Sequence, residues 1–297
     1  MKLNQNIRAI LFVGAAPVGA GFANAFLLAT PLVTTFTVGI APSTAAIIAG
    51  SAASVTIDNF SHRPTDTSTS TNTNTQTTAN SGSVISQANA DAVFISNCQE
   101  LLAANLSKSE VAGSGSNYSG LAQSQAAVIG DFDIDAEETF SFNFQTVLHL
   151  VTSVDNPPSE RARTTGNISF SLIDTVSNIL LDSFELSATL RSFSRGDLSL
   201  LSYSDSFNPT KINYDFLPPG RATSRSSYIS GVYSRSFDRA TNLRLVEVKK
   251  NSAVAEAVVI PQAVPEPSTI LGTAMFLSFL AKGRKLKHKL SEVKSKV

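Results

Sequence analysis

Apolar and polar residues alternate through the middle of the chain with a period of two, which is the pattern of a β-strand with one buried face. Residues 139–151 show this pattern most clearly, because large apolar side chains occupy every second position up to residue 144 and again near the end. We therefore predict a strand there, with one face on a core and the other in water. The apolar positions are Phe140, Phe142, Phe144, Leu148 and Leu150.

Shorter segments with strand character precede and follow this one, and turn-forming Asn, Gly and Pro residues separate several of them. No long helical pattern lies between them, so we predict an all-β fold, an antiparallel β-sandwich of jelly-roll-like type, as one domain over residues 54–250. The further predicted strands are 55–60, 167–173, 184–190, 198–203, 212–216, 228–233 and 243–248, and the predicted breaks are 156–158, 195–197, 208–209 and 218–220.

A threonine-rich stretch over residues 65–78 permits two interpretations, because Thr occupies every second position in it. It is either a Thr-faced edge strand or O-glycosylated stalk, or a polar loop. We favour the loop, since nothing in the stretch is apolar enough to be buried. Residues 84–110 carry no clear pattern, and the Gly- and Ser-rich residues 113–120 predict a flexible turn without a phosphate-binding or dinucleotide-binding signature.

The N-terminal segment resembles a secretory signal. Lys2 and Arg8 precede a run without charged residues that extends to Ile57. Small-residue cleavage sites for a signal peptidase end at Ala25 and at Ala53. We favour Ala53, which makes residues 1–53 the signal peptide and starts the mature chain at the first predicted strand. A resident transmembrane helix is the alternative, and Pro and Gly residues within the run disfavour it.

The C-terminal segment has three parts in a fixed order, after a linker over residues 251–264. Pro265, Glu266 and Pro267 lie outside any helix, because proline lacks an amide donor and favours extended chain. The uncharged, apolar residues 268–281 follow, and as a transmembrane helix they would span about 21 Å of a bilayer core about 30 Å thick. Their basic flank can extend to the lipid headgroups and hold the tail on the cytoplasmic side. The flank begins with Lys282, Arg284 and Lys285.

This arrangement resembles the PEP-CTERM sorting signal of bacterial exported proteins. Residues 129–144 and 240–248 are, in addition, similar to segments of a cyanobacterial family of such proteins. The resemblance implies that an exosortase-type membrane protease reads the Pro-Glu-Pro unit. It also implies an intermediate that is anchored in inner-membrane lipid, followed by release or attachment at the cell surface. It implies no chemistry for the exported domain.

Charge is distributed unevenly, although the chain has 23 basic and 23 acidic residues. Seven of the basic residues lie in residues 282–297, so the central part of the chain is acidic. An acidic surface disfavours nucleic acid as a partner. Cys98 is the sole cysteine, which excludes an intrachain disulfide. Five arginines are expected to pair with surface acids: Arg221, Arg225, Arg235, Arg239 and Arg244.

The sequence contains few residues that typically carry catalysis, and it indicates no cofactor. The histidines are His62, His149 and His288, and with Cys98 they lack the spacing of a zinc site. A Gly-x-Ser-x-Gly nucleophile turn is absent. One acidic run offers a candidate calcium site, although a solvated strand edge is the interpretation that we favour. Its alternating carboxylates are Asp131, Asp133 and Asp135.

We therefore hold three functional hypotheses. The leading one is a non-enzymatic exported protein of the cell surface or extracellular matrix. The second is a carbohydrate-binding or adhesive module with exopolysaccharide as its partner, in which exposed Tyr203, Tyr228 and Tyr233 would stack on sugar rings. The third, a polysaccharide hydrolase, requires two facing carboxylates, and no pattern in the sequence indicates such a pair.

Overall fold

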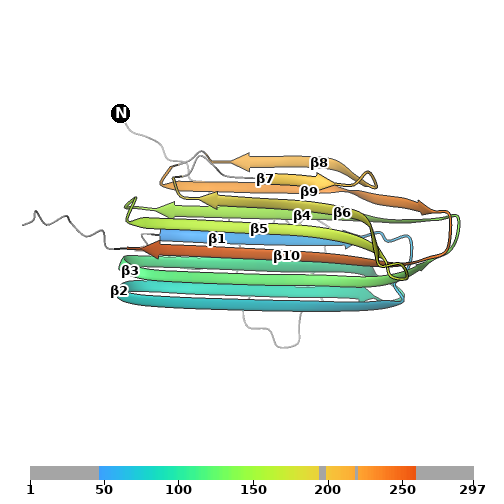
Figure 1. Ribbon diagram of the computed structural model, residues 1–297, viewed down its shortest axis with the longest axis horizontal. Helices are drawn as coiled ribbons and strands as arrows, with labels where there is room; N and C mark the ends of the chain where they lie inside the picture. The colour runs from blue at the N-terminus through green and yellow to red at the C-terminus, as the bar shows by residue number, and fades with distance from the viewer. Residues whose placement is uncertain (1–46, 194–198, 218–219, 259–297) are drawn as a thin grey trace, which may run out of the picture. The chain divides into compact units, whose positions relative to one another are not determined.

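The computed structural model describes residues 47–193, 199–217 and 220–258, which form ten β-strands and no helix (Figure 1). Every strand pairing is antiparallel, so the predicted all-β antiparallel fold is confirmed. Within these residues, no helix has the length and apolar character needed to cross a membrane. The strands are β1 (Ile47–Asp58), β2 (Asp66–Ser96), β3 (Leu101–Ile134), β4 (Glu138–Val154), β5 (Glu160–Asp174), β6 (Ile179–Arg191), β7 (Ser199–Tyr203), β8 (Phe207–Phe216), β9 (Ala222–Phe237) and β10 (Thr241–Ala257).

All ten strands belong to one sheet, in the order β7-β6-β5-β10-β3-β1-β4-β9-β8, with β2 paired to β3. The long strand β3 pairs with β1 over residues 103–113 and with β10 over residues 118–134. Side chains from β4 meet side chains from β5 across the interior, as in the stacked rings of Phe142 and Phe170 at 6.4 Å. The sheet therefore folds back on itself into two facing layers. The first layer contains β1, β4, β9 and β8, and the second contains β10, β5, β6 and β7.

The fold-back occurs where β3 and its partner β2 bend together, between residues 113 and 118 of β3. Gly115 has φ of +87°, a conformation that residues with a side chain rarely adopt. A Cβ atom on Gly113 would lie 2.2 Å from the ring of Tyr118, so a larger residue there would displace that ring. The Gly- and Ser-rich segment predicted to be a flexible turn is therefore a bend inside a continuous strand pair.

Aromatic side chains fill one end of the space between the layers. Phe142 and Tyr233 stack at 4.9 Å, and Phe170 meets Phe184 edge-on at 5.5 Å. The predicted apolar face of residues 139–151 points into this cluster, as expected from its period-two pattern. At the other end the interior is built mainly from small side chains, including Ala122, Ala253 and Ala255. The fully buried rings are Phe132, Phe140, Phe142, Phe144, Phe170, Phe184, Phe207 and Tyr233.

A polar band separates the two apolar clusters. Glu247 and Lys249 of β10 are fully buried and lie 3.3 Å apart, and Asn105 of β3 also donates a hydrogen bond to Glu247. Burial raises the pKa of the Glu247 carboxyl and lowers the pKa of Lys249 to about 8. Asn251 accepts a hydrogen bond from Ser51 Oγ at 2.8 Å, which joins β10 to β1. The band thus fixes how the two layers align.

The threonine-rich stretch is not a loop, which corrects our prediction. Residues 66–78 form the first part of β2, where they pair residue by residue with residues 131–119 of β3. Most of their side chains are exposed. The stretch needs no core of its own, because the backbone hydrogen bonds to β3 hold it in place and Thr is favourable in strands.

The sheet also extends beyond the predicted domain of residues 54–250. Strand β1 begins at Ile47, inside the predicted signal peptide, and Ile47, Ala49, Ser51 and Ala53 are all buried. Strand β10 continues to Ala257, inside the predicted linker. The extension of β1 consists largely of Ala, Gly and Ser, and the extension of β10 is rich in Ala. Such small side chains gave no clear pattern of apolar and polar positions.

Two predicted breaks can be compared with the structure, and one of them is wrong. Residues 156–158 lie in the turn between β4 and β5, as predicted. Residues 208–209 lie inside β8, where a register shift near Pro209 accommodates the missing amide donor. The break at 195–197, Pro218 and Pro219 of the fourth break, the segment 1–46 and the segment 259–297 lie outside the described residues.

Phe142 tests the aromatic cluster, because its side chain is fully buried and contacts several rings. Phe142→Ala should lower the free energy of unfolding by about 3–5 kcal/mol, through lost burial and the cavity left behind. Phe216→Ala is the matched control, since Phe216 is 46% exposed and its loss should cost about 1 kcal/mol or less. Urea unfolding of the two variants measures the difference. Equal costs would contradict the assignment of the core.

Candidate functional site

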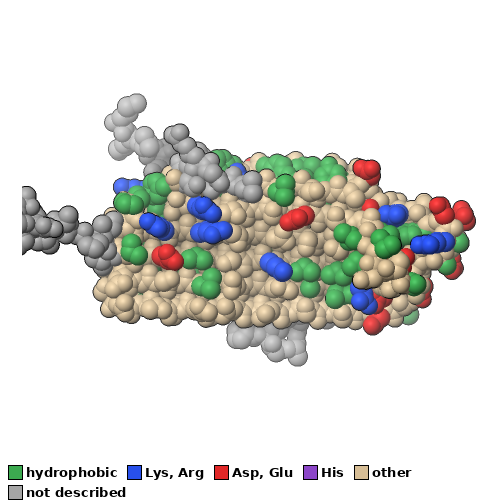
Figure 2. Space-filling view, viewed as in Figure 1, with side chains coloured by type: hydrophobic (Ala, Val, Ile, Leu, Met, Phe, Trp, Pro, Cys, Tyr) green, Lys and Arg blue, Asp and Glu red, His purple; other side chains and the backbone are tan. Residues whose placement is uncertain are grey.

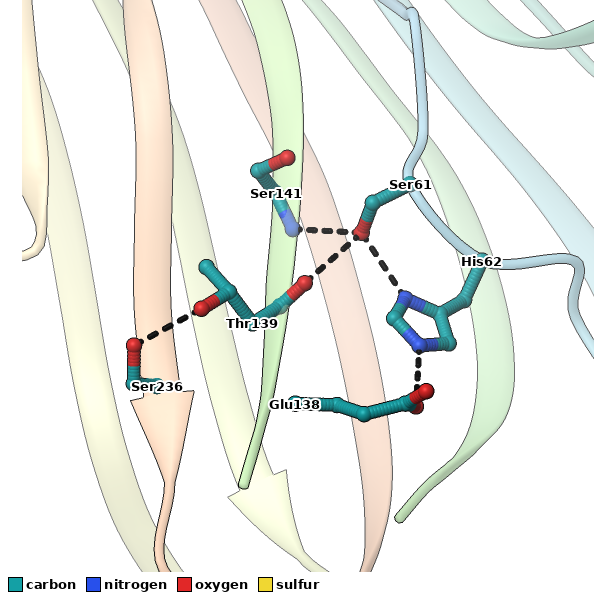
Figure 3. Close-up of polar contacts among 6 residues, drawn as sticks. All are labelled: Ser61, His62, Glu138, Thr139, Ser141 and Ser236. Carbon is teal, nitrogen blue, oxygen red and sulfur yellow. Dashed lines mark hydrogen bonds and ion pairs between the residues drawn. The ribbon is translucent and has the colours of Figure 1, made fainter. Parts of the chain in front are cut away.

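Ser61, His62 and Glu138 form a chain of hydrogen bonds that joins the segment after β1 to the start of β4 (Figure 3). Ser61 Oγ lies 2.8 Å from His62 Nδ1, and His62 Nε2 lies 2.8 Å from Glu138 Oε2. The His62 side chain is mostly shielded, whereas the Glu138 side chain is about half exposed. The bond from His62 holds the pKa of the Glu138 carboxyl below its usual value.

The same serine is tied to β4 by further bonds. Its Oγ accepts the backbone N–H of Ser141 at 2.8 Å and lies 3.2 Å from the carbonyl oxygen of Thr139, to which it can donate. The backbone N–H of Ser61 also donates to the carbonyl of Ser141 at 2.9 Å. The three contacts of Ser61 Oγ thus hold the segment after β1 against β4.

A serine, a histidine and a carboxylate in a row are also the components of a nucleophilic triad. A triad needs, in addition, donors placed around a developing oxyanion and space for a substrate at the serine oxygen. Among the described residues, the one backbone N–H that reaches Ser61 Oγ donates to that oxygen itself, and the groove described below is lined by other residues. We therefore interpret the cluster as a clasp that holds residues 61–62 on β4.

Sequence reasoning missed this cluster because Glu138 is 76 residues from His62 in the chain. The adjacent pair Ser61-His62 was the only local signal. His149, in contrast, lies in β4 with Nδ1 at 2.6 Å from Ser226 Oγ. Burial lowers the pKa of His149 to about 4, so its imidazole is neutral at physiological pH. Cys98 is exposed in the turn between β2 and β3.

The candidate calcium ligands do not assemble into a metal site. Asp131 receives two bonds from Arg244, with Nε at 2.7 Å from Oδ1 and Nη2 at 2.8 Å from Oδ2. Phe132 and Ile134, which alternate with the acidic residues, are buried. Within the part of the chain that the structure describes, no three His, Cys, Asp or Glu side chains are grouped so that they could hold a metal ion.

The three tyrosines expected to stack on sugars do not share a face. Tyr233 is buried and donates to Asp182 Oδ2 at 2.9 Å, so the prediction that it is exposed is wrong. Tyr228 is half-buried, with Lys211 Nζ 5.3 Å from the centre of its ring. Tyr203 is 44% exposed and stacks on Phe184.

Three of the five arginines pair with acids, as predicted. Arg235 lies 2.7 Å from Asp182 and Arg239 lies 3.7 Å from Asp174, in addition to the pair between Arg244 and Asp131. Arg225 instead has its guanidinium 5.2 Å from the ring centre of Phe216.

A polar groove of about 470 Å³ crosses β10, β5 and β6 of the second layer and the adjoining strands β3 and β2. Its lining is made almost entirely of hydroxyl and amide side chains, which donate and accept hydrogen bonds without carrying charge. Of the described residues, Lys250 is the one charged residue that lines it. Among the lining residues are Asn72, Gln123, Gln125, Asn167 and Thr189.

The predicted sorting residues lie outside the described residues. These are Pro265, Glu266 and Pro267, together with Lys282, Arg284 and Lys285. Comparison with known proteins finds no family model, no curated protein and no solved structure that matches this chain.

The clasp predicts a measurable change at Glu138. His62→Ala removes the hydrogen bond that contributes most to its lowered pKa, so the pKa of Glu138 should rise toward 4.5. A carboxyl-detected NMR titration measures this shift. Ser236→Ala is the control, because Ser236 bonds Thr139 and not the His62–Glu138 pair. An unchanged Glu138 pKa in His62→Ala would show that the pair does not form in solution.

Proposed function

We propose that this chain is a non-enzymatic exported protein of the cell surface or extracellular matrix, processed by an exosortase-type protease. The observation that carries the proposal is the order of parts at the C-terminus, with Pro-Glu-Pro at residues 265–267, an apolar segment and then a basic tail. An extended Pro-Glu-Pro unit just outside a short membrane helix is positioned for a membrane-embedded protease. The basic tail opposes translocation, because each charge is costly within the bilayer.

The described fold is compatible with this role. Its two facing layers support the finer assignment, a jelly-roll-like β-sandwich, which we include in the proposal. Its exposed strand faces are rich in Ser, Thr, Asn and Gln, as suits a protein that functions in water outside the cell. Our interpretation of the Ser61–His62–Glu138 cluster as a clasp is compatible with a non-enzymatic role.

At the N-terminus, we propose signal cleavage after Ala25 in place of Ala53. Cleavage after Ala53 would remove seven residues of β1, a strand that lies between β3 and β4. The lost residues include buried Ile47, Ala49 and Ser51, and the exposed sheet edges would lose their hydrogen-bond partners. Cleavage after Ala25 leaves the whole strand in the mature protein.

Mass spectrometry of the exported protein tests both ends at once. The parent should begin within a few residues of Phe26 and end near Pro267. Glu266→Ala should remain exported and membrane-anchored with its C-terminus intact, because the charge that the protease reads is lost. Glu256→Ala, an exposed acid at the end of β10, is the matched control and should be processed normally.

Two outcomes would contradict this proposal. Processing of Glu266→Ala at the parent rate would show that the Pro-Glu-Pro unit is not recognised. A mature chain starting at Ser54 would mean that the exported protein lacks the first half of β1.

A second candidate function is carbohydrate binding, and the observation that favours it is the groove on the second layer. Amide and hydroxyl groups spread over five strands match the vicinal hydroxyls of a neutral polysaccharide, and the near absence of charge disfavours an ionic ligand. The site carries no aromatic side chain, so binding would rest on hydrogen bonds and be weak.

The groove can be tested with a soluble neutral glucan. The double variant Gln125→Ala with Asn167→Ala should weaken binding roughly tenfold or more, because each lost hydrogen bond contributes about 1 kcal/mol. Asn213→Ala with Asn242→Ala, on exposed positions outside the groove, is the control. Isothermal titration calorimetry measures both. Equal affinities for the two double variants would exclude this groove as the site.

A further inference from the structure

Strand β2 has a long, unpaired edge. It contains 31 residues and pairs with β3 along one side, while no described strand pairs with its other side. In Figure 1 it runs along the lower rim of the sheet. In an antiparallel edge strand, every second residue points its backbone N–H and C=O away from the sheet. About half of the residues of β2 therefore have backbone groups that can form hydrogen bonds with another strand.

This edge lacks the features that usually keep sheet edges apart. Proteins protect edges with charged side chains, proline, bulges or short strands. Between Asp66 and Asp91, β2 has no charged residue and no proline, and its pairing with β3 shows no register shift. In Figure 2 the rim along β2 is almost entirely uncharged, apart from its right-hand end.

The bend of the hairpin places both legs of β2 on the same rim. The first leg, residues 66–79, pairs with the second-layer half of β3, and residues 81–96 pair with the first-layer half. The two legs touch where Ser86 Oγ donates to the carbonyl oxygen of Gln76 at 3.2 Å. A partner that pairs with this rim can therefore extend both layers together.

We propose that the rim of β2 pairs with the rim of β2 from a second copy of this chain, antiparallel and about a two-fold axis. An antiparallel edge is complementary to itself, because the outward N–H of a residue on one copy can donate to the outward C=O of a residue on the other copy, and the reverse. The long uncharged stretch lets two copies approach without repulsion. Its exposed Thr, Ser and Asn side chains can then bond across the new pairing. This inference is independent of the proposed sorting, and the rim shares Asn72, Thr73 and Asn74 with the groove.

Sedimentation velocity of the purified full chain in detergent tests the pairing. The parent should sediment as a dimer. The triple variant of Thr71, Thr73 and Thr75 to Lys puts three like charges on each paired edge and should raise the dimer dissociation constant at least about tenfold. The control carries the same charge on exposed positions elsewhere, with Ser183, Ser234 and Asn242 changed to Lys, and should dimerise like the parent. Circular dichroism confirms that each variant keeps its strands.

Disulfide trapping gives a second readout that does not depend on added charge. In a Cys98→Ser background, single cysteines are placed in turn at positions 68 to 78 of β2. A two-fold antiparallel pairing brings one position close to its own copy, so crosslinking should peak at one residue and its nearest neighbours. A parent that is monomeric, uniform crosslinking along β2, or dimers unaffected by the three lysines would overturn the proposal. Monomers that bind a strand of another protein would overturn it as well.

Discussion

The fold depends on a single bend in the hairpin of β2 and β3. One strand, β3, supplies the backbone partner of β1 in the first layer and of β10 in the second, so both layers are built on one continuous segment. The bend requires close approach at Gly113 and a positive φ at Gly115. A strand of this length could otherwise stay extended, which would leave the apolar faces of both halves in water.

The interior explains why the layers close in one alignment. Along the inward face of β10, Leu243 and Leu245 lie on the aromatic cluster, Glu247 to Asn251 lie in the polar band, and Ala253 to Ala257 line the end that is built mainly from small side chains. A shift of one layer would place the buried Glu247–Lys249 pair against apolar side chains. Such a shift would also break the hydrogen bond from Asn105 to Glu247. Leaving buried charge without its partners costs several kcal/mol, so these contacts contribute more to alignment than to stability.

The sequence predicted the elements that carry strong apolar alternation. The face of Phe140 to Phe144 and the face of Phe184 to Leu190 point into the core as expected. Tyr228 and Tyr233 are separated by an odd number of positions in β9, so their side chains must lie on opposite faces of the strand. The sequence therefore excluded that both are exposed on one face, and our prediction overlooked this. The first half of β1 and nearly all of β2 were missed, because Ala, Gly, Ser and Thr give little hydropathy contrast. Their strand structure is set by pairing with β3, which is a long-range effect. The contact of His62 with Glu138 likewise joins residues that are far apart in the sequence, so no local pattern indicates it.

The most direct test of this account is amide hydrogen exchange along β1. Because β1 is held between β3 and β4 from Ile47 onward, amides of residues 49–55 should exchange as slowly as those of Phe142 and Phe144 in β4. Rapid exchange over residues 47–53, with protection starting only near Ser54, would contradict it. The folded domain would then begin where the sequence pattern alone had placed it.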